Sequence, residues 1–335
     1  MFVPQNIHKV RNIVVSPSKQ AAYAGALADA ALSHRPRIDG GAFASLAKGF
    51  FSDADMAGKG HAFATMRQET QRDSGLQMSV AVSDWMAAWI AAFVMGKVTT
   101  SGAGPYTHKF VFEPTATQPP VTTIYCEDTS AVKYKMPDVA VSEAEFSGGD
   151  SGVIQAQFSL LGSGRHADGA ILPSVPAIAT PIFLLGSDVQ ILIGPPGAPV
   201  ATEAERIKSW RVRLSQNLSL HRGPGSGLYA SQTKVGVQRA SVGFVMAAKD
   251  TDDIRGLFLA NTEQELQINI NSGAAAQLKF RFPSIHLSAV QCGADGNDVI
   301  YNVECDEQAL LKKGANDLVE VTVINSQATY LTLPA

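Results

Sequence analysis

Short runs in which apolar and polar residues alternate, or in which β-branched residues are frequent, recur along most of the chain. Successive side chains of a strand point to opposite faces, so these runs predict half-buried β-strands. The predicted strands cover residues 9–15, 62–69, 77–82, 107–113, 121–127, 139–146, 153–161, 189–193, 209–220, 235–247, 264–271, 277–282, 285–291, 299–306 and 319–325. We therefore expect a mainly β fold with few helices.

The most apolar stretch, residues 80–98, departs from this strand pattern. Its length approaches that of a membrane span, but it contains Asp84 and ends at Gly96. Ser83 or Asp84 is suited to be the N-cap of a helix, and Gly96 to be its left-handed last residue. Large aromatic residues recur four positions apart along one face: Trp85, Trp89 and Phe93. We expect a buried amphipathic helix here rather than a membrane-spanning one.

The two halves of the chain resemble each other. Tyr-Lys-Met-Pro at residues 134–137 falls without a gap on Phe-Arg-Phe-Pro at residues 280–283, which lie 146 positions further along. The same register continues the apolar alternation through residue 155, with four identities: Pro137, Ser142, Val153 and Ile154. Self-similarity of this kind indicates a repeated architecture.

The order of the elements agrees with a repeat. Each half is expected to run strand, long loop, strand, helix, strands and hairpin, with the opening strands at residues 9–15 and 209–220. The second helix is expected at about residues 251–260, and the prolines and small residues of 164–181 suit a linker. The predicted division is a first domain at residues 1–165, a linker at 166–186 and a second domain at 187–335.

Charged residues are scarce in this chain. They make up 17% of it, whereas an ordinary soluble domain has about 25%. The formal net charge is −3, and the one close basic cluster consists of Arg206, Lys208, Arg211 and Arg213. Their alternate spacing is typical of the solvated face of a strand, so a nucleic-acid-binding protein is not indicated. A surface poor in charge favours coverage by other subunits.

The cysteines and the amino terminus bear on the compartment. Cys126, Cys292 and Cys305 are too few and too scattered for a disulfide framework or a zinc site, which suggests a reducing compartment. The first residues lack the basic-then-apolar order of a signal peptide. We therefore expect synthesis in the cytoplasm.

Two short strings imitate functional motifs. Gly-Asp-Ser-Gly at residues 149–152 copies the nucleophile string of trypsin-like proteases, but no stretch resembles the histidine motif of that family. We expect a hairpin turn there, opposite residues 295–298. Residues 53–58 begin like a calcium loop, yet the twelfth position is Ala64 instead of a bidentate carboxylate. This stretch is expected to be a polar loop.

The histidines form no recognisable ligand or catalytic set. None of them pairs at helical i, i+4 spacing: His8, His34, His61, His108, His166, His221 and His286. We expect scattered surface or core histidines. No combination of acid, base, nucleophile or metal ligands stands out, so the sequence indicates neither an enzyme nor a cofactor or metal site.

The order of these features resembles the tail tube (major tail) proteins of long, flexible-tailed bacteriophages. The resemblance rests on the opening strand, the long loop, the aromatic helix and the hairpin with Pro137, followed by the strands at residues 208–218 and 320–325. It implies two similar β-sandwich or half-barrel domains, each flanked by a short helix and joined edge to edge in a ring. Stacked rings would then form the tube through which the genome passes.

The resemblance also implies an oligomeric state and partners. Two tube domains in one chain imply a trimeric, pseudo-hexameric ring, and closed rings arise wherever the rotation between neighbours closes. The implied partners are further copies of the chain, a tape-measure protein in the lumen during assembly, tail-tip and tail-terminator proteins at the ends, and phage DNA that passes without specific binding. No membrane insertion is expected. The implied location is the virion tail, assembled in the host cytoplasm, with a neutral or acidic lumen.

The long loops at residues 34–59 and 221–234 are expected to reach neighbouring subunits or rings. Their candidate contact residues are Phe50, Phe51, Leu228 and Tyr229. Aromatic side chains in loops often mark interfaces, although packing back onto their own domain is an equal alternative.

Two other interpretations remain open for the whole chain. One is another tubular virion component, such as a tail-tip, terminator or injection-tube protein. The other is a β-sandwich ligand-binding module, which would need clustered exposed aromatic residues, whereas the chain has three tryptophans.

Overall fold

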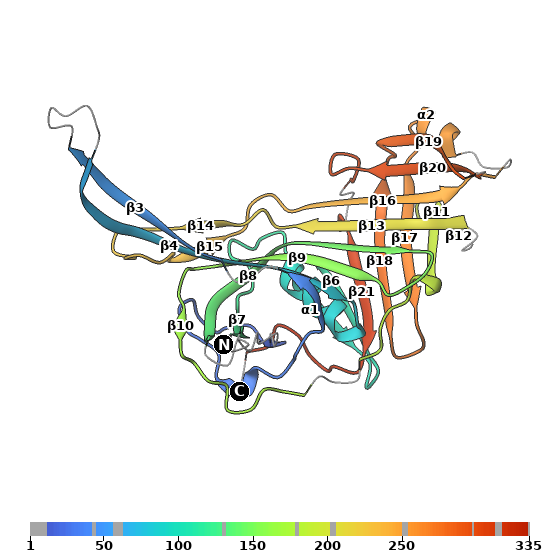
Figure 1. The fold of residues 1–335 in the computed structure, drawn as a ribbon. Coiled ribbons are helices and arrows are strands. Elements are labelled where there is room, and N and C mark those ends of the chain that lie inside the picture. The colour runs from blue at the N-terminus through green and yellow to red at the C-terminus, as the bar shows by residue number, and fades with distance from the viewer. Residues whose placement is uncertain are drawn as a thin grey trace, which may run out of the picture.

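A computed structural model describes residues 12–41, 45–55, 63–128, 132–177, 181–201, 206–249, 254–296, 298–311 and 317–333. Two large antiparallel sheets lie on either side of a hydrophobic core (Figure 1). The mainly β fold of the β-sandwich kind is thus confirmed, and neither sheet closes into a barrel.

The larger sheet has twelve strands, and its main path has the order β19-β20-β16-β13-β8-β9-β4-β2. Along that path the strands are β19 (Ala289–Asp295), β20 (Asp298–Cys305), β16 (Arg239–Ala247), β13 (Ile207–Ser215), β8 (Lys133–Gly149), β9 (Gln155–Gly162), β4 (Phe63–Ala81) and β2 (Ile38–Gly41). Four more strands pair beside this path: β1 (Asn12–Val14), β3 (Ser45–Asp55), β7 (Thr122–Glu127) and β10 (Ala167–Asp168).

The second sheet has seven strands in the order β12-β11-β17-β18-β21-β6-β5. They are β12 (Val200–Ala201), β11 (Val189–Gly194), β17 (Gln264–Asn271), β18 (Gln277–Ile285), β21 (Glu320–Asn325), β6 (Tyr106–Phe112) and β5 (Gly96–Ser101). A separate pair is formed by β14 (Ser219–His221) and β15 (Gln232–Lys234). The short 3₁₀ turns are η1 (Asp29–Ala31) and η2 (Gly186–Asp188).

Helix α1 (Asp84–Met95) lies between the sheets, as the sequence predicts. Gly96 ends it in the left-handed conformation with φ 85°, while Ser83 is the N-cap without a side-chain capping hydrogen bond. The indole of Trp89 donates to the carbonyl of Ser16 at 2.7 Å. The expectation of an amphipathic helix is wrong, because strands of both sheets cover α1 and only Trp85 is partly exposed. Among the described residues no helix is long and apolar enough to cross a membrane.

Both halves of the chain contribute to both sheets. In the larger sheet β13 pairs with β8, and in the smaller one β21 pairs with β6. The main core likewise combines both halves, with the rings of Phe146 and Phe280 5.2 Å apart. The division into residues 1–165, 166–186 and 187–335 remains a prediction.

The loop predicted at residues 34–59 is wrong where the structure describes it. It contains β2 and β3, which pair in turn with the 19-residue strand β4. A hairpin of β3 with the first part of β4 projects from the body, and we call it the arm (Figure 1). Its partner β4 lies further along the chain, so no pattern within residues 34–59 indicates this pairing. The calcium-like string therefore begins in a strand, and its residues 56–58 lie outside the described part.

Other sequence expectations hold more closely. Residues 150–152 form the turn between β8 and β9, with Ser151 exposed and Gly152 at φ 83°. Helix α2 (Ile254–Leu259) falls within the predicted range, although residues 250–253 lie outside the described part. Of the predicted opening strand, residues 12–14 form β1, and residues 9–11 are not described.

Candidate assembly surfaces

A buried carboxylate marks a bend in β8. Asp138 has φ 60° and no exposed surface, and it follows Pro137 inside a strand whose first part pairs with β7 and whose second part pairs with β9 and β13. A positive φ is uncommon outside glycine but tolerated by Asp. The positive φ of Asp138 lies where β8 changes from pairing with β7 to pairing with β9.

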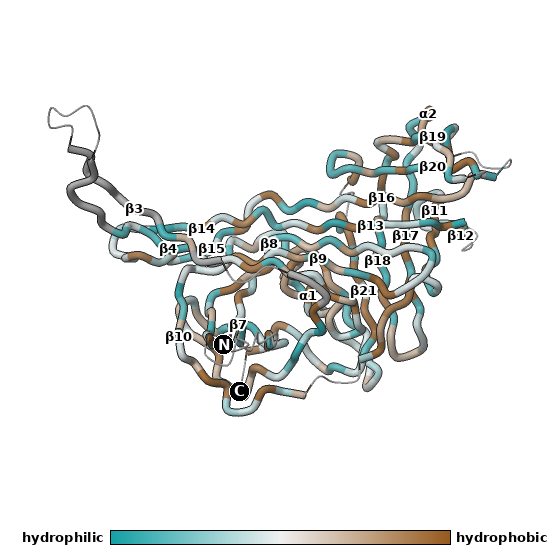
Figure 2. Tube along the Cα trace, viewed as in Figure 1, coloured by the Kyte–Doolittle hydropathy of each residue, from teal (hydrophilic) through white to brown (hydrophobic). Residues whose placement is uncertain are grey.

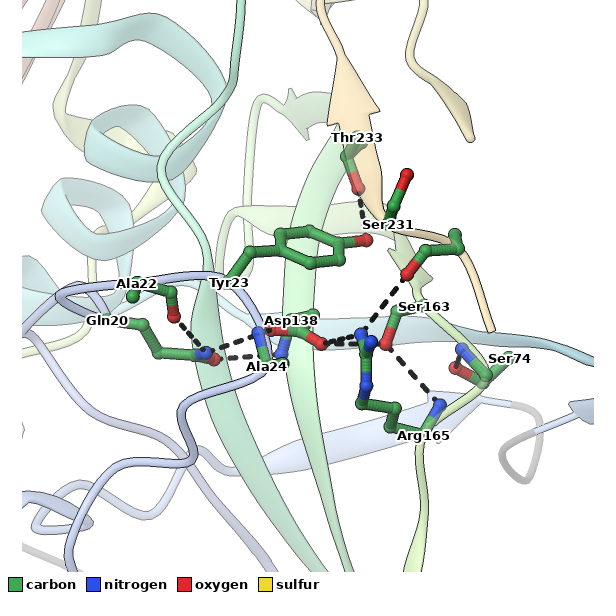
Figure 3. A network of polar contacts seen from close by, with 12 residues as sticks. Gln20, Ala22, Tyr23, Ala24, Ser74, Asp138, Ser163, Arg165, Ser231 and Thr233 are labelled. Atoms are coloured by element: carbon green, nitrogen blue, oxygen red, sulfur yellow. Dashed lines mark hydrogen bonds and ion pairs between the residues drawn. The ribbon is translucent and has the colours of Figure 1, made fainter. Parts of the chain in front are cut away.

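Four donors converge on the Asp138 carboxylate (Figure 3). Its Oδ1 accepts hydrogen bonds from Gln20 Nε2 at 3.0 Å and from the Ala24 amide at 2.7 Å. Its Oδ2 accepts from Ser163 Oγ at 2.8 Å and from Arg165 Nη1 at 2.9 Å. A fully buried charge is tolerated when it is paired and hydrogen-bonded in this way.

The same network reaches the residues beside the arm. Arg165 Nη1 also donates to the Ala230 carbonyl at 3.1 Å, and the Tyr23 hydroxyl lies 3.1 Å from Thr233 Oγ1 in β15. Burial raises the pKa of Tyr23. The Asp138 network thus ties the bend of β8 to the β14–β15 pair, which runs alongside β4 at the base of the arm (Figure 1).

The base of the arm is also held by charged groups. Arg72 in β4 pairs with Glu69, and its amide donates to the Leu228 carbonyl at 2.7 Å. Arg222, which follows β14, also forms an ion pair with Asp73 in β4. The segment that follows β14 is therefore fastened to β4 rather than free in solution.

The four predicted contact residues lie along this arm and its base. Leu228 and Tyr229 are partly buried, and the Tyr229 ring lies under Arg72 and Arg165, with centroid distances of 5.9 and 5.4 Å. Phe50 and Phe51 lie in β3, with their Cα atoms opposite Glu69 and Gln68. The structure thus places the two aromatic residues of β3 and the two residues after β14 along the arm and its base. Their role as contacts between subunits remains a prediction.

The outer face of the larger sheet is polar. Along β13 the buried residues Trp210, Val212 and Leu214 alternate with exposed Arg211 and Arg213. Figure 2 shows the same alternation of hydrophobic and hydrophilic positions along β13 and β16. This face therefore carries its charge on strands, at fixed positions.

The arginines on this face are neutralised by neighbouring carboxylates. Arg213 lies 2.6 Å from Glu143, Arg211 lies 2.6 Å from Glu304, and Arg239 lies 2.6 Å from Glu307. A hydrogen bond with Glu143 raises the pKa of the Arg213 guanidinium. Exposed pairs of this kind add little stability, about 0–1 kcal/mol each. Their effect is a polar surface on which Arg211, Arg213 and Arg239 are each paired with a carboxylate.

The outermost strands of the larger sheet have open edges. In the part of the chain that is described, β19 pairs with β20 alone and β2 pairs with β4 alone. An unpaired strand edge presents backbone donors and acceptors that another chain can use. The two edges are therefore candidate interfaces.

The described residues contain no group of three or more His, Cys, Asp or Glu side chains placed to hold a metal ion. His108 is a satisfied core histidine: it is buried, contacts the Thr100 hydroxyl and the Asn325 side chain, and its pKa is lowered by burial. His166 lies 2.6 Å from Asp168, and His8 and His61 fall outside the described residues.

The Asp138 network could not be predicted from periodicity, because its members come from four distant segments. The signal that was available is the Pro137-Asp138 pair, which interrupts the alternation inside a long strand. A polar residue after proline in a buried strand favours a bend.

Open sheet edges, a projecting arm and a polar sheet face are features of this β-sandwich protein that suit contacts with other chains. Residues 53–318 match the family described as phage tail tube protein. The match covers most of the chain, which therefore belongs to that family of structural proteins of the virion tail. A search of the curated proteins gives no match.

Proposed function

We propose that three copies of this chain form a closed ring and that the rings stack into the tail tube through which the phage genome is delivered. The observation that carries the proposal is the pairing of β8 with β13, which joins the two halves of one chain edge to edge. One chain would thereby fill two of six similar places around the ring. A repeated rotation that closes gives such a ring.

The polar face of the larger sheet would line the channel. Its arginines are matched by Glu143, Glu304 and Glu307, so a passing duplex would meet few unpaired cations. A lining of free Lys or Arg would instead bind phosphates by releasing counterions. Paired charges therefore support passage of DNA without specific binding.

The arm would reach the next ring or subunit. Its projection from the body supports this role, with Phe50 and Phe51 in β3 and with Leu228 and Tyr229 at its base as the proposed contact region. The proposed partners beyond the chain itself are a tape-measure protein in the lumen during assembly, and tail-tip and tail-terminator proteins at the ends. Assembly is proposed to take place in the host cytoplasm.

Electron microscopy of the purified protein over a concentration series, with mass measurement of the smallest closed particle, tests the proposal. Stacked rings containing three chains each are expected. Rings of six chains would contradict the trimeric arrangement. Single rings that never stack would favour a terminator, and a monomer at every concentration would contradict self-assembly.

A further inference from the structure

The larger sheet repeats its strand order. From β8 in the middle of the sheet to β2 at one edge, the strands of the first half have the order β8-β9-β4-β2. From β19 at the other edge to β13 in the middle, the strands of the second half have the order β19-β20-β16-β13. In each set the first two strands form a hairpin, and the third strand runs into a helix. By position, β2 therefore corresponds to β13, and β8 corresponds to β19.

A bulge supports the match between β2 and β13. Ile38 faces Val80, and the register then shifts before Gly40 faces Ser79. In the same way Ile207 faces Met246, and the register shifts before Ser209 faces Val245. Bulges are designed features of a strand pair, so their shared position fixes which residues correspond. Gly40 corresponds to Ser209, and Gly41 to Trp210. The expected equivalence of residues 9–15 with 209–220 is corrected by this topology.

A pair of serines supports the match between β8 and β19. Ser142 Oγ donates to the Ser159 carbonyl at 3.1 Å, and Ser288 Oγ donates to the Glu304 carbonyl at 2.8 Å. Ser142 lies at the register shift of the β8–β9 pairing, and Ser288 directly precedes β19; each reaches the facing strand of its hairpin. The two serines are 146 positions apart, as in the sequence repeat. In that register Gly148 corresponds to Ala294 and Gly149 to Asp295.

Within one chain the corresponding strands are joined. We call the pairing of β8 with β13 the internal junction; it runs from Ser209 facing Gly149 to Ser215 facing Glu143. Trp210 faces Gly148, where an added Cβ would lie 2.9 Å from the indole nitrogen. The internal junction is thus a close-packed antiparallel contact between the two halves.

The outer strand β19 lacks the usual protection of an edge. Its last five residues are exposed, and from Ala289 to Ala294 it contains neither a charged residue nor a proline. Natural sheets commonly blunt open edges with lysine, proline or a bulge. An unprotected edge of this length is suited to a strand from another molecule.

We propose that β19 of one subunit pairs antiparallel with β2 of a second copy of this chain, repeating the internal junction between molecules. The corresponding residues place Gly40 opposite Asp295 and Gly41 opposite Ala294 of the neighbour. This assignment rests on the proposed ring, to which it adds the strands and the register of each contact between subunits.

Cross-linking tests the register. In a Cys292→Ser background, Gly41→Cys combined with Ala294→Cys places two thiols on facing strands, within the Cα separation that a disulfide spans. Mild oxidation is expected to give covalent dimers and trimers, with no larger species. The mismatched control, Gly41→Cys with Ala289→Cys, is expected to lose this product. Equal cross-linking of both variants, or of neither in assembled tubes, would overturn the assignment.

The native thiol supplies a second measurement. Cys292 is exposed in the single chain, whereas Cys126 and Cys305 are buried. A maleimide should therefore label Cys292 in the unassembled protein and lose access to it in tubes. Cys292→Arg should prevent ring closure while the chain stays folded by circular dichroism, and Cys292→Ser should assemble normally.

The outcomes separate this inference from the proposed function. Tubes in which Cys292 stays fully reactive would overturn the β2–β19 contact and leave the tail-tube proposal standing. Covalent products that extend to hexamers would support the contact and contradict the three-subunit ring. A chain that forms neither rings nor tubes would contradict both.

Discussion

At the scale of single residues, Asp138 is a buried carboxylate on which four hydrogen-bond donors converge. It accepts hydrogen bonds from an amide side chain, a backbone amide, a hydroxyl and a guanidinium, and it has no exposed surface. Removing such an acceptor leaves buried donors unsatisfied, and this is more damaging than the loss of the contact itself.

Asp138→Ala is expected to lower the free energy of unfolding by about 3–5 kcal/mol, because it leaves the Arg165 charge without its buried partner. Asp138→Asn is the matched control, since Asn tolerates a positive φ and keeps one acceptor oxygen. Asp138→Asn should lower the free energy of unfolding by less than Asp138→Ala does. Urea unfolding of the unassembled protein followed by tryptophan fluorescence measures both, and a loss below about 1 kcal/mol for Asp138→Ala would contradict this role.

At the scale of elements, side-chain pairs tie neighbouring strands of the smaller sheet together. Glu265 in β17 accepts from Arg281 in β18 at 2.8 Å, and Arg281 also reaches Glu320 in β21 at 3.4 Å. Burial of Glu265 raises its pKa, but hydrogen bonds from Arg281, Gln267 and Gly197 outweigh this and lower the pKa to about 2. Three adjacent strands therefore share one ionised network.

This pKa makes stability depend on acid in a defined range. The pKa of Glu265 is lower in the folded state than in the unfolded state. Its contribution to stability is therefore present above the unfolded pKa of about 4.3 and is lost as the pH falls towards 2. Glu265→Gln should lower the free energy of unfolding by about 3 kcal/mol at pH 7. It should also show a weaker decline of stability between pH 4.5 and 2. Unfolding curves across that range measure it; an unchanged acid dependence would show that another group is responsible.

Sequence alone identifies elements whose signals are local. Helix α1 is predictable because Ser83, Gly96 and the apolar run lie within it or beside it. The hairpin of β8 and β9 is predictable for the same reason, from its alternation and its Gly-Asp-Ser-Gly turn. Strands β2 and β3 escape prediction because their pairing with β4 depends on contacts that no local pattern encodes.

The candidate surfaces also combine features that are visible in the sequence with contacts that only the tertiary fold reveals. The arginine alternation of β13 is visible in the sequence, but the carboxylates that pair with Arg211 and Arg213 come from β20 and β8. Leu228 and Tyr229 stand out in the sequence as apolar residues in a loop, whereas their contacts with Arg72 and Arg165 follow from the tertiary fold. Partners distant in sequence could not be assigned from spacing.

At the scale of the whole molecule, the two sheets differ in what they offer to solvent. Within the described residues, the larger one is open at both edges and presents a polar face with paired charges. In the proposed tube that face lines the channel. Uncharged exposed positions such as Gln77 and Gln157 then allow the charge of the lining to be changed without disturbing an ion pair.

Gln77→Lys combined with Gln157→Lys should make assembled tubes retain a short DNA duplex at low salt, and the native tubes should not. Each phosphate that an introduced lysine neutralises steepens the dependence of log K on log salt by about 0.9. Co-sedimentation at increasing salt measures this. Gln77→Glu with Gln157→Glu is the matched control, and equal DNA retention by the two variants would show that this face lies elsewhere in the tube.

The internal junction also bears on how quickly tubes start. A contact made while one chain folds needs no encounter between molecules, because its two strands are held at a high effective concentration by the chain that links them. In the proposed ring with six similar places, three molecules then have to meet instead of six. The rate of nucleation should therefore rise with a much lower power of protein concentration, so that tube growth can begin while the chain is still scarce.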